Sequence, residues 1–343
     1  MISASQRRLC FLLAASMFAC VAIVVLLAHV TRVLPDFVDA EMARMRESNG
    51  VYLYDGGYVD DADYVLLGLL PRADHRRGGV YFIGDSQLRA AFMPTELPAS
   101  EQALIHNYSI GDLHHRDQRY YVKMLVEEFG LLDGGAQNTT IVLGISHNMA
   151  RPRDYAPGSY VTEALARHGL YTYDAMGGGM HRSAMPAPER FVAMQHDIAS
   201  RFLRVVFGLR ASRIKPITPA QRTVDFITLG DGWREAMVSE VDELAQLLDY
   251  LRARRVRVIA IISPSGSWER QLPYERTYLE MVEPVFAARD MRLIDQSRLL
   301  PDNEIADNTH PTYRGRTRLQ AIDRALALQA LEEMGIRPAP ETR

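Results

Sequence analysis

Short runs of β-forming residues alternate with amphipathic segments along most of this 343-residue chain. Runs this short and apolar are typical of buried strands, and apolar residues spaced three and four apart are typical of a helix face. We predict strands at residues 79–84, 103–107, 139–145, 256–262 and 292–295. We predict helices at residues 116–129, 235–254, 274–288 and 317–334. The alternation predicts an α/β fold in which a parallel sheet carries helices on both faces.

The composition is that of an ordinary globular chain, with 48% hydrophobic and 24% charged residues. The net charge of −3 gives no reason to expect a nucleic-acid partner. Cys10 and Cys20, the two cysteines, lie in an N-terminal apolar stretch, so the rest of the chain has no disulfide and no thiolate metal site.

The N-terminus carries a membrane-anchor signal. Arg7 and Arg8 precede an apolar run at residues 9–30, and about 20 apolar residues suffice to cross a bilayer. We predict a cytoplasmic tail at residues 1–8, a single transmembrane helix at residues 9–30, and a periplasmic remainder held at the inner (cytoplasmic) membrane. Two alternatives stay open. One is a cleaved signal peptide, whose apolar core is usually shorter, and the other is a lipid-modified Cys20.

The rest of the chain divides into an approach segment, a main domain and a tail. The approach segment is residues 31–78, the main domain is residues 79–335, and the tail is residues 336–343. Residues 150–232 interrupt the alternation of strands and helices. We predict that they form an insertion over the functional site, and a peripheral decoration is an equally good interpretation.

Two polar motifs stand where a parallel sheet would bring them together. Gly84-Asp85-Ser86 follows the first predicted strand, and Asp307-Asn-Thr-His310 precedes the last predicted helix. Sites in such sheets form at the carboxyl ends of the strands. A serine nucleophile needs a base, and a histidine base needs a carboxylate to orient it. We therefore predict a catalytic triad of Ser86, His310 and Asp307, against the alternative that Ser86 belongs to an ordinary helix cap.

With these motifs the chain resembles the SGNH (GDSL-like) hydrolase superfamily over roughly residues 79–330. The resemblance implies a three-layer α/β/α, flavodoxin-like domain with Ser86 at the start of a helix. It also implies that Gly111 donates a backbone N–H to the oxyanion hole. The family's usual Gly-x-Asn-Asp is replaced here by Gly144-Ile-Ser-His-Asn148. Ser146 matches the asparagine by position and Asn148 by chemistry. We favour Asn148 as the donor, with His147 facing solvent.

Within the superfamily, the anchor and Ser263-Pro264 resemble the membrane-anchored, DltD-like branch. That branch is linked to moving acyl groups onto cell-envelope polymers. The resemblance implies a serine esterase or O-acyltransferase whose partners are an acylated glycan or lipid-linked substrate and a membrane acyltransferase complex. It implies no cofactor. The alternative is a non-catalytic scaffold or glycan-binding subunit of the same fold.

A histidine cluster and one tryptophan are further site candidates. His106, His114 and His115 cluster near the second strand, but adjacent histidines point apart and no matching carboxylate set accompanies them. We therefore predict no metal site. Trp268 follows the fourth strand closely enough to be a candidate substrate contact.

Overall fold

The computed structural model describes residues 12–13, 15–20, 22–23, 65, 69–70, 73–152, 171–174, 179–182, 231–306 and 309–338. Its centre is a five-stranded sheet in the order β2-β1-β3-β6-β7, in which all neighbouring strands are parallel. This order is one of the common doubly wound arrangements. The strands are β1 (Gly79–Ile83), β2 (Ile105–Asn107), β3 (Thr139–Ile145), β6 (Arg257–Ile262) and β7 (Arg292–Asp295).

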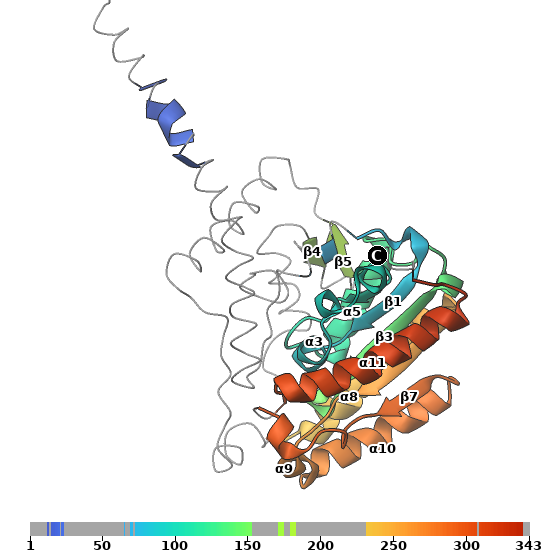
Figure 1. The fold of residues 1–343 in the computed structure, drawn as a ribbon. Coiled ribbons are helices and arrows are strands. Elements are labelled where there is room, and N and C mark those ends of the chain that lie inside the picture. The colour runs from blue at the N-terminus through green and yellow to red at the C-terminus, as the bar shows by residue number, and fades with distance from the viewer. Residues whose placement is uncertain are drawn as a thin grey trace, which may run out of the picture.

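Helices cover both faces of this sheet (Figure 1). The long ones are α5 (His115–Glu127), α8 (Trp233–Ala253), α10 (Pro273–Ala287) and α11 (Tyr313–Glu333), and the short ones are α3 (Ser86–Ala91), α4 (Ala99–Gln102) and α9 (Ser267–Arg270). Short 3-10 turns lie at His75–Arg77, Pro94–Glu96, Ala136–Asn138, His147–Ala150 and Asp302–Glu304. The α/β class with a parallel sheet, predicted from the alternation, is confirmed.

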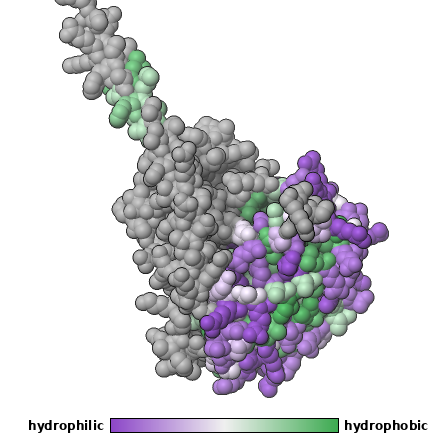
Figure 2. All heavy atoms as spheres, viewed as in Figure 1, coloured by the Kyte–Doolittle hydropathy of each residue, from purple (hydrophilic) through white to green (hydrophobic). Residues whose placement is uncertain are grey.

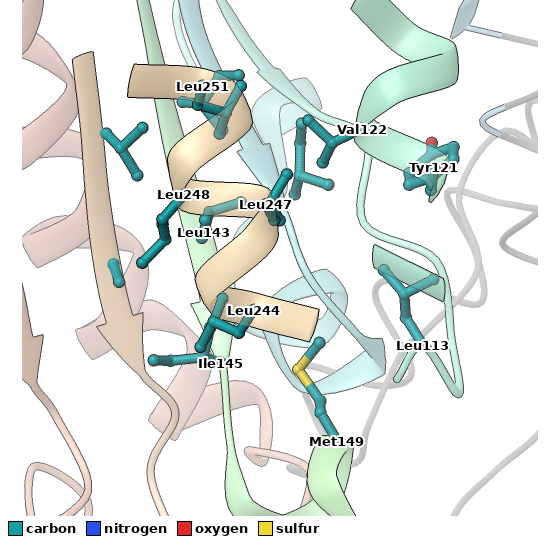
Figure 3. Packing of buried hydrophobic residues seen from close by; sticks show 14 of the residues in the cluster. Leu113, Tyr121, Val122, Leu143, Ile145, Met149, Leu244, Leu247, Leu248 and Leu251 are labelled. Carbon is teal, nitrogen blue, oxygen red and sulfur yellow. The ribbon is translucent and has the colours of Figure 1, made fainter. Parts of the chain in front are cut away.

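Alternate residues of the central strands enter two separate apolar clusters. On one face, Leu143 and Ile145 of β3 pack with α5, α8 and α10, and on the other face Val142 packs with α3 and α11. Figure 3 shows the first cluster, where Leu244 and Leu248 of α8 lie against β3. The strands are buried on both faces, which is why they read as continuous apolar runs in the sequence.

Helix α11 begins at Tyr313, before the predicted start at residue 317. Thr312 caps it by accepting a hydrogen bond from the Gly315 N–H at 3.3 Å. Gly315, which precedes the predicted start, therefore belongs to the first turn of the helix. A Cβ on Gly315 would lie 2.5 Å from the Glu304 carbonyl oxygen, so glycine lets the first turn of α11 approach the preceding segment.

Part of the predicted insertion is described. Strands β4 (Tyr171–Asp174) and β5 (Gly179–Arg182) pair antiparallel as a separate two-stranded sheet. Most of the other residues of the insertion and most of the approach segment lie outside the described residues, as do residues 339–343 of the predicted C-terminal tail.

Residues 12–13, 15–20 and 22–23 are helical, and their apolar side chains, including Met17 and Phe18, are exposed (Figure 2). Among the described residues, no helix is both long enough and apolar enough to span a membrane. Residues 9–11, 14, 21 and 24–30 of the predicted anchor lie outside the described residues. The anchor therefore stays a prediction.

Candidate active site

Ser86 is the first residue of α3, immediately after the turn that leaves β1. Asp85 caps the helix, because its side chain accepts a hydrogen bond from the Gln87 N–H at 2.9 Å. The turn is tight: a Cβ on Gly84 would lie 3.0 Å from the Cα of Gly144 in β3. The sequence Gly84-Asp85-Ser86 therefore places a partly exposed serine hydroxyl at a helix start, above the carboxyl end of the central strands.

His310 reaches Ser86 from a loop that closes on itself before α11. The Ala306 N–H donates to the His310 carbonyl at 2.9 Å, and Ile305 forms an antiparallel bridge with Pro311. Across 224 positions of the chain, His310 Nε2 lies 2.9 Å from Ser86 Oγ. His310 Nδ1 lies 3.2 Å from the Thr309 hydroxyl. Asp307, the third predicted member of the triad, lies outside the described residues.

Gly111 lies beside the start of the Ser86 turn. The chain after β2 continues along β1, since the Tyr108 N–H donates to the Phe82 carbonyl at 2.8 Å and the Ile110 N–H donates to the Gly84 carbonyl at 3.0 Å. Gly111 comes next and is buried. The following residue, Asp112, has a positive φ of 60°.

Ser146 and Asn148, the two candidates for the side-chain oxyanion donor, face different surroundings. Ser146 is 3% exposed, and its hydroxyl lies 3.4 Å from the Asp85 carboxylate. Asn148 follows in the 3-10 turn His147–Ala150, and its side chain lines the pocket that contains Ser86 and His310. Its amide nitrogen lies 3.5 Å from Glu269 of α9, at the edge of hydrogen-bonding distance.

The pocket at Ser86 has a volume of about 160 Å³. Its walls come from the β1–α3 turn, the segment after β2, the segment after β3 and the His310 loop. The lining residues are Asp85, Ser86, Gln87, Asp112, Leu113, Asn148, Arg151, Thr309 and His310. Gly111 and Ser146 are not among them, although each is a near neighbour in sequence of residues that are.

Ionisable side chains line the pocket. Burial raises the pKa of Asp85 above its usual value, against the opposing effects of the Gln87 N–H and the nearby His310. On the other side, Arg151 Nη2 lies 3.4 Å from Asp112 Oδ1. Arg151, Asp112, Gln87 and Thr309 line the pocket but were not predicted as site residues. All except Arg151 directly flank predicted residues, and that adjacency is the signal that could have indicated them.

His147 does not face solvent, so that prediction is wrong. The side chain is buried, and its Nε2 lies 3.8 Å from Glu269 Oε1. Burial, assisted by the positive charge of Arg151, lowers the pKa of His147 to about 4. Its ring is therefore neutral at neutral pH. The 3-10 turn places His147 inward and the next residue, Asn148, towards the pocket.

The remaining candidates take part in packing. His106 stacks with both Tyr81 and Tyr108, whose ring centroids lie 5.2 and 5.6 Å from its own. His115 Nε2 lies 2.7 Å from the Tyr278 hydroxyl. Trp268 packs beside the small apolar cluster of Leu300 and Ile305 and does not line the pocket. Within the described part of the chain, no group of three or more His, Cys, Asp or Glu residues could hold a metal ion.

No family model and no curated protein matches the chain. Among solved structures, it is similar to a Bacteroides fragilis protein that carries a provisional acylhydrolase assignment. The two share 10% sequence identity, the match covers 78% of this chain and 95% of the other, and the TM-score is 0.39.

Proposed function

We propose that this chain is a serine acyl esterase or O-acyltransferase of the SGNH type. The observation that carries the proposal is the 2.9 Å contact between Ser86 Oγ and His310 Nε2, made at a helix start inside a pocket. A histidine nitrogen at this distance can accept the proton of the serine hydroxyl. The membership of the SGNH superfamily and its DltD-like branch is part of the proposal.

In the proposed reaction, Ser86 Oγ attacks the ester carbonyl while its proton passes to His310 Nε2. The negative charge on the carbonyl oxygen is stabilised by backbone N–H groups of Ser86 and Gly111 and by the Asn148 amide. His310 then gives the proton to the departing alkoxide, which leaves an acyl group on Ser86. Water or a sugar hydroxyl attacks this acyl-enzyme, with His310 as base again and Asp307 orienting it.

The size of the pocket supports a short acyl group. Pockets for drug-sized ligands usually have volumes of roughly 300–1,000 Å³, and the pocket formed by the described residues measures about 160 Å³. We propose an O-acetyl or similarly small acyl group on a cell-envelope glycan or lipid-linked precursor. A predicted inner-membrane anchor would keep the domain beside such a substrate, in the periplasm.

The nucleophile is tested by labelling the full-length protein with a fluorophosphonate and measuring intact mass. We expect one added phosphonate group on wild type and on Ser239→Ala, which removes a serine outside the pocket. We expect none on Ser86→Ala and slower labelling of His310→Ala. Labelling that persists in Ser86→Ala would place the nucleophile elsewhere. No labelling of wild type would favour the non-catalytic alternative. The supporting observation for that alternative is the replacement of the family's Gly-x-Asn-Asp by Gly144-Ile-Ser-His-Asn148.

The topology is tested separately with reporters fused at the C-terminus. Because Arg7 and Arg8 precede the apolar run, residues 33–343 should be exported. Alkaline phosphatase should then be active in the fusion and a cytoplasmic reporter inactive. The reverse pattern would contradict the periplasmic location but would not bear on the proposed reaction.

A further inference from the structure

Gln87, the residue after the proposed nucleophile, connects the two halves of the site. Its side chain is 4% exposed and lies at the wall of the pocket. Its amide Nε2 donates a hydrogen bond of 3.2 Å to the Thr309 carbonyl, across 222 positions of the chain. Thr309 immediately precedes His310. A single side chain on α3 therefore contacts the peptide that carries the proposed base.

The other end of the same amide is unsatisfied. Gln87 Oε1 is buried and has no hydrogen-bond partner among the described residues. A buried acceptor without a partner destabilises a fold, because the group gives up its hydrogen bonds to water and receives none in return. A methionine of similar length would fill the same space without this penalty. On stability alone, glutamine is a poor choice for position 87.

The hydrogen bonds within the His310 loop join its two ends but do not attach it to α3. The Ala306 N–H to His310 carbonyl bond and the Ile305–Pro311 bridge close the loop on itself. Neither of them connects the loop to α3. Besides the contact of His310 with Ser86, the Gln87 amide makes such a connection, one residue from Ser86 on one side and one residue from His310 on the other.

We infer that Gln87 is a positioning residue that fixes the His310 peptide relative to α3, so that His310 Nε2 stays within proton-transfer distance of Ser86 Oγ. The inference rests on the proposed function. Misplacing a reacting group by about 1 Å can lower a rate by about 100-fold. In this interpretation, the unsatisfied Oε1 lowers stability, and it is present because the same amide carries the N–H₂ group that donates to the Thr309 carbonyl.

The test is Gln87→Met in the full-length protein, read out by the rate of phosphonate labelling at Ser86 and by the melting temperature. We expect labelling to slow by about 10- to 100-fold. We expect the melting temperature to change by no more than about 2 °C, because the lost hydrogen bond to the Thr309 carbonyl offsets the removal of the unsatisfied acceptor. A purely structural role would lower the melting temperature together with the labelling rate, so slow labelling at an unchanged melting temperature distinguishes positioning from structure.

Gln320→Met is the matched control. Gln320 is also buried, but both ends of its amide are bonded to Met93, with Oε1 2.7 Å from the Met93 N–H and Nε2 2.8 Å from its carbonyl. We expect this variant to melt at a lower temperature and to label at the wild-type rate. The two substitutions are chemically identical, so any general effect of methionine appears in both.

A second variant, Gln87→Glu, covers the case in which Gln87→Met does not fold. A protonated glutamic acid can still donate to the Thr309 carbonyl, whereas the carboxylate cannot. The ratio of its labelling rate to that of wild type should therefore be well below one at neutral pH and should rise at acidic pH, where the carboxyl group takes up its proton. A ratio near one at neutral pH, or wild-type labelling of Gln87→Met, would overturn the inference and leave Ser86 as the nucleophile. If wild type does not label, the proposed function fails and this inference fails with it.

Discussion

At the scale of single residues, the end of β3 offers two candidate oxyanion donors that differ in what they face. Asn148 lines the pocket with Ser86 and His310, whereas the Ser146 hydroxyl lies towards Asp85. An amide N–H₂ group also carries two donors against one for a hydroxyl. We therefore expect Asn148→Ala to lower kcat for an acyl ester by about 100- to 1,000-fold with little change in KM.

The companion variant Ser146→Ala should stay within about tenfold of wild type, since its hydroxyl does not line the pocket. Both are measured by steady-state kinetics on a short-chain acyl ester. The reverse order of effects would give the role to Ser146. Full activity in both variants would mean that backbone N–H groups alone hold the oxyanion.

Single residues were predictable from the sequence where their chemistry is local. Ser86 and His310 were predicted to meet because a serine after a buried strand and a histidine before the last helix would lie at the same edge of such a sheet, and the structure places them 2.9 Å apart. His147 was placed wrongly because the helices that pack against its turn, α8 and α10, come from far along the chain. Glu269 of α9, which lies beside its ring, is equally distant in sequence, and no local pattern around His147 indicates these neighbours.

At the scale of elements, β3 and α3 pack without room for a side chain between them. A Cβ on Gly144 would lie 2.7 Å from Leu88 Cδ2 and 2.9 Å from Leu88 Cβ. Gly144→Ala must therefore push α3 away from the sheet, and Ser86 moves with it. Overpacking of this kind costs about 1–3 kcal/mol.

We expect Gly144→Ala to lower the free energy of unfolding by that amount and to slow phosphonate labelling more than the stability loss explains. Chemical denaturation and labelling on the same preparations measure the two effects. Ala150→Gly, a buried change beyond the end of β3, is the comparison for stability loss without displacement of α3. Wild-type labelling in Gly144→Ala would show that the turn at Ser86 is insensitive to the position of α3.

The elements themselves were largely predictable because burial on both faces makes β1, β3 and β6 continuous apolar runs. No single apolar run indicates the strand order β2-β1-β3-β6-β7. Only the family resemblance, which implies a flavodoxin-like domain, bears on that order. The early start of α11 was missed for a different reason. Glycine and proline favour loops, so Gly315 and Pro311 give no sign of a helix start. In the structure, the missing side chain of Gly315 lets the first turn of α11 lie close to Glu304.

At the scale of the whole molecule, buried titratable groups make stability depend on pH in two opposing ways. His106, His115 and His147 have pKa values lowered by burial to about 4, so their contribution to stability is lost as the pH falls from about 6.5 towards 4. Asp323 of α11 acts in the other direction. Burial raises its pKa to about 7, against the effect of the hydrogen bond from Gln296.

The sign for Asp323 follows from comparing folded and unfolded states. The unfolded carboxyl ionises near 3.8 and the folded one near 7, so the folded state holds the proton more tightly. Stability from this group is fully present below about pH 4 and is lost as the pH rises to about 7. One carboxylate oxygen accepts from Gln296 Nε2 at 2.8 Å, and the other is buried without a partner among the described residues.

Asp323→Asn removes this titration while it keeps the acceptor for Gln296. Its stability relative to wild type should therefore increase between about pH 4 and pH 8, by roughly 4 kcal/mol at most. Urea denaturation of both proteins across this range measures the difference, and the titrations of His106, His115 and His147 cancel because both proteins contain them. Asp242→Asn, an exposed position on α8, gives the baseline for a carboxylate that stays in water. A difference that is constant or shrinks as the pH rises would mean that Asp323 is already ionised in the folded protein at acidic pH.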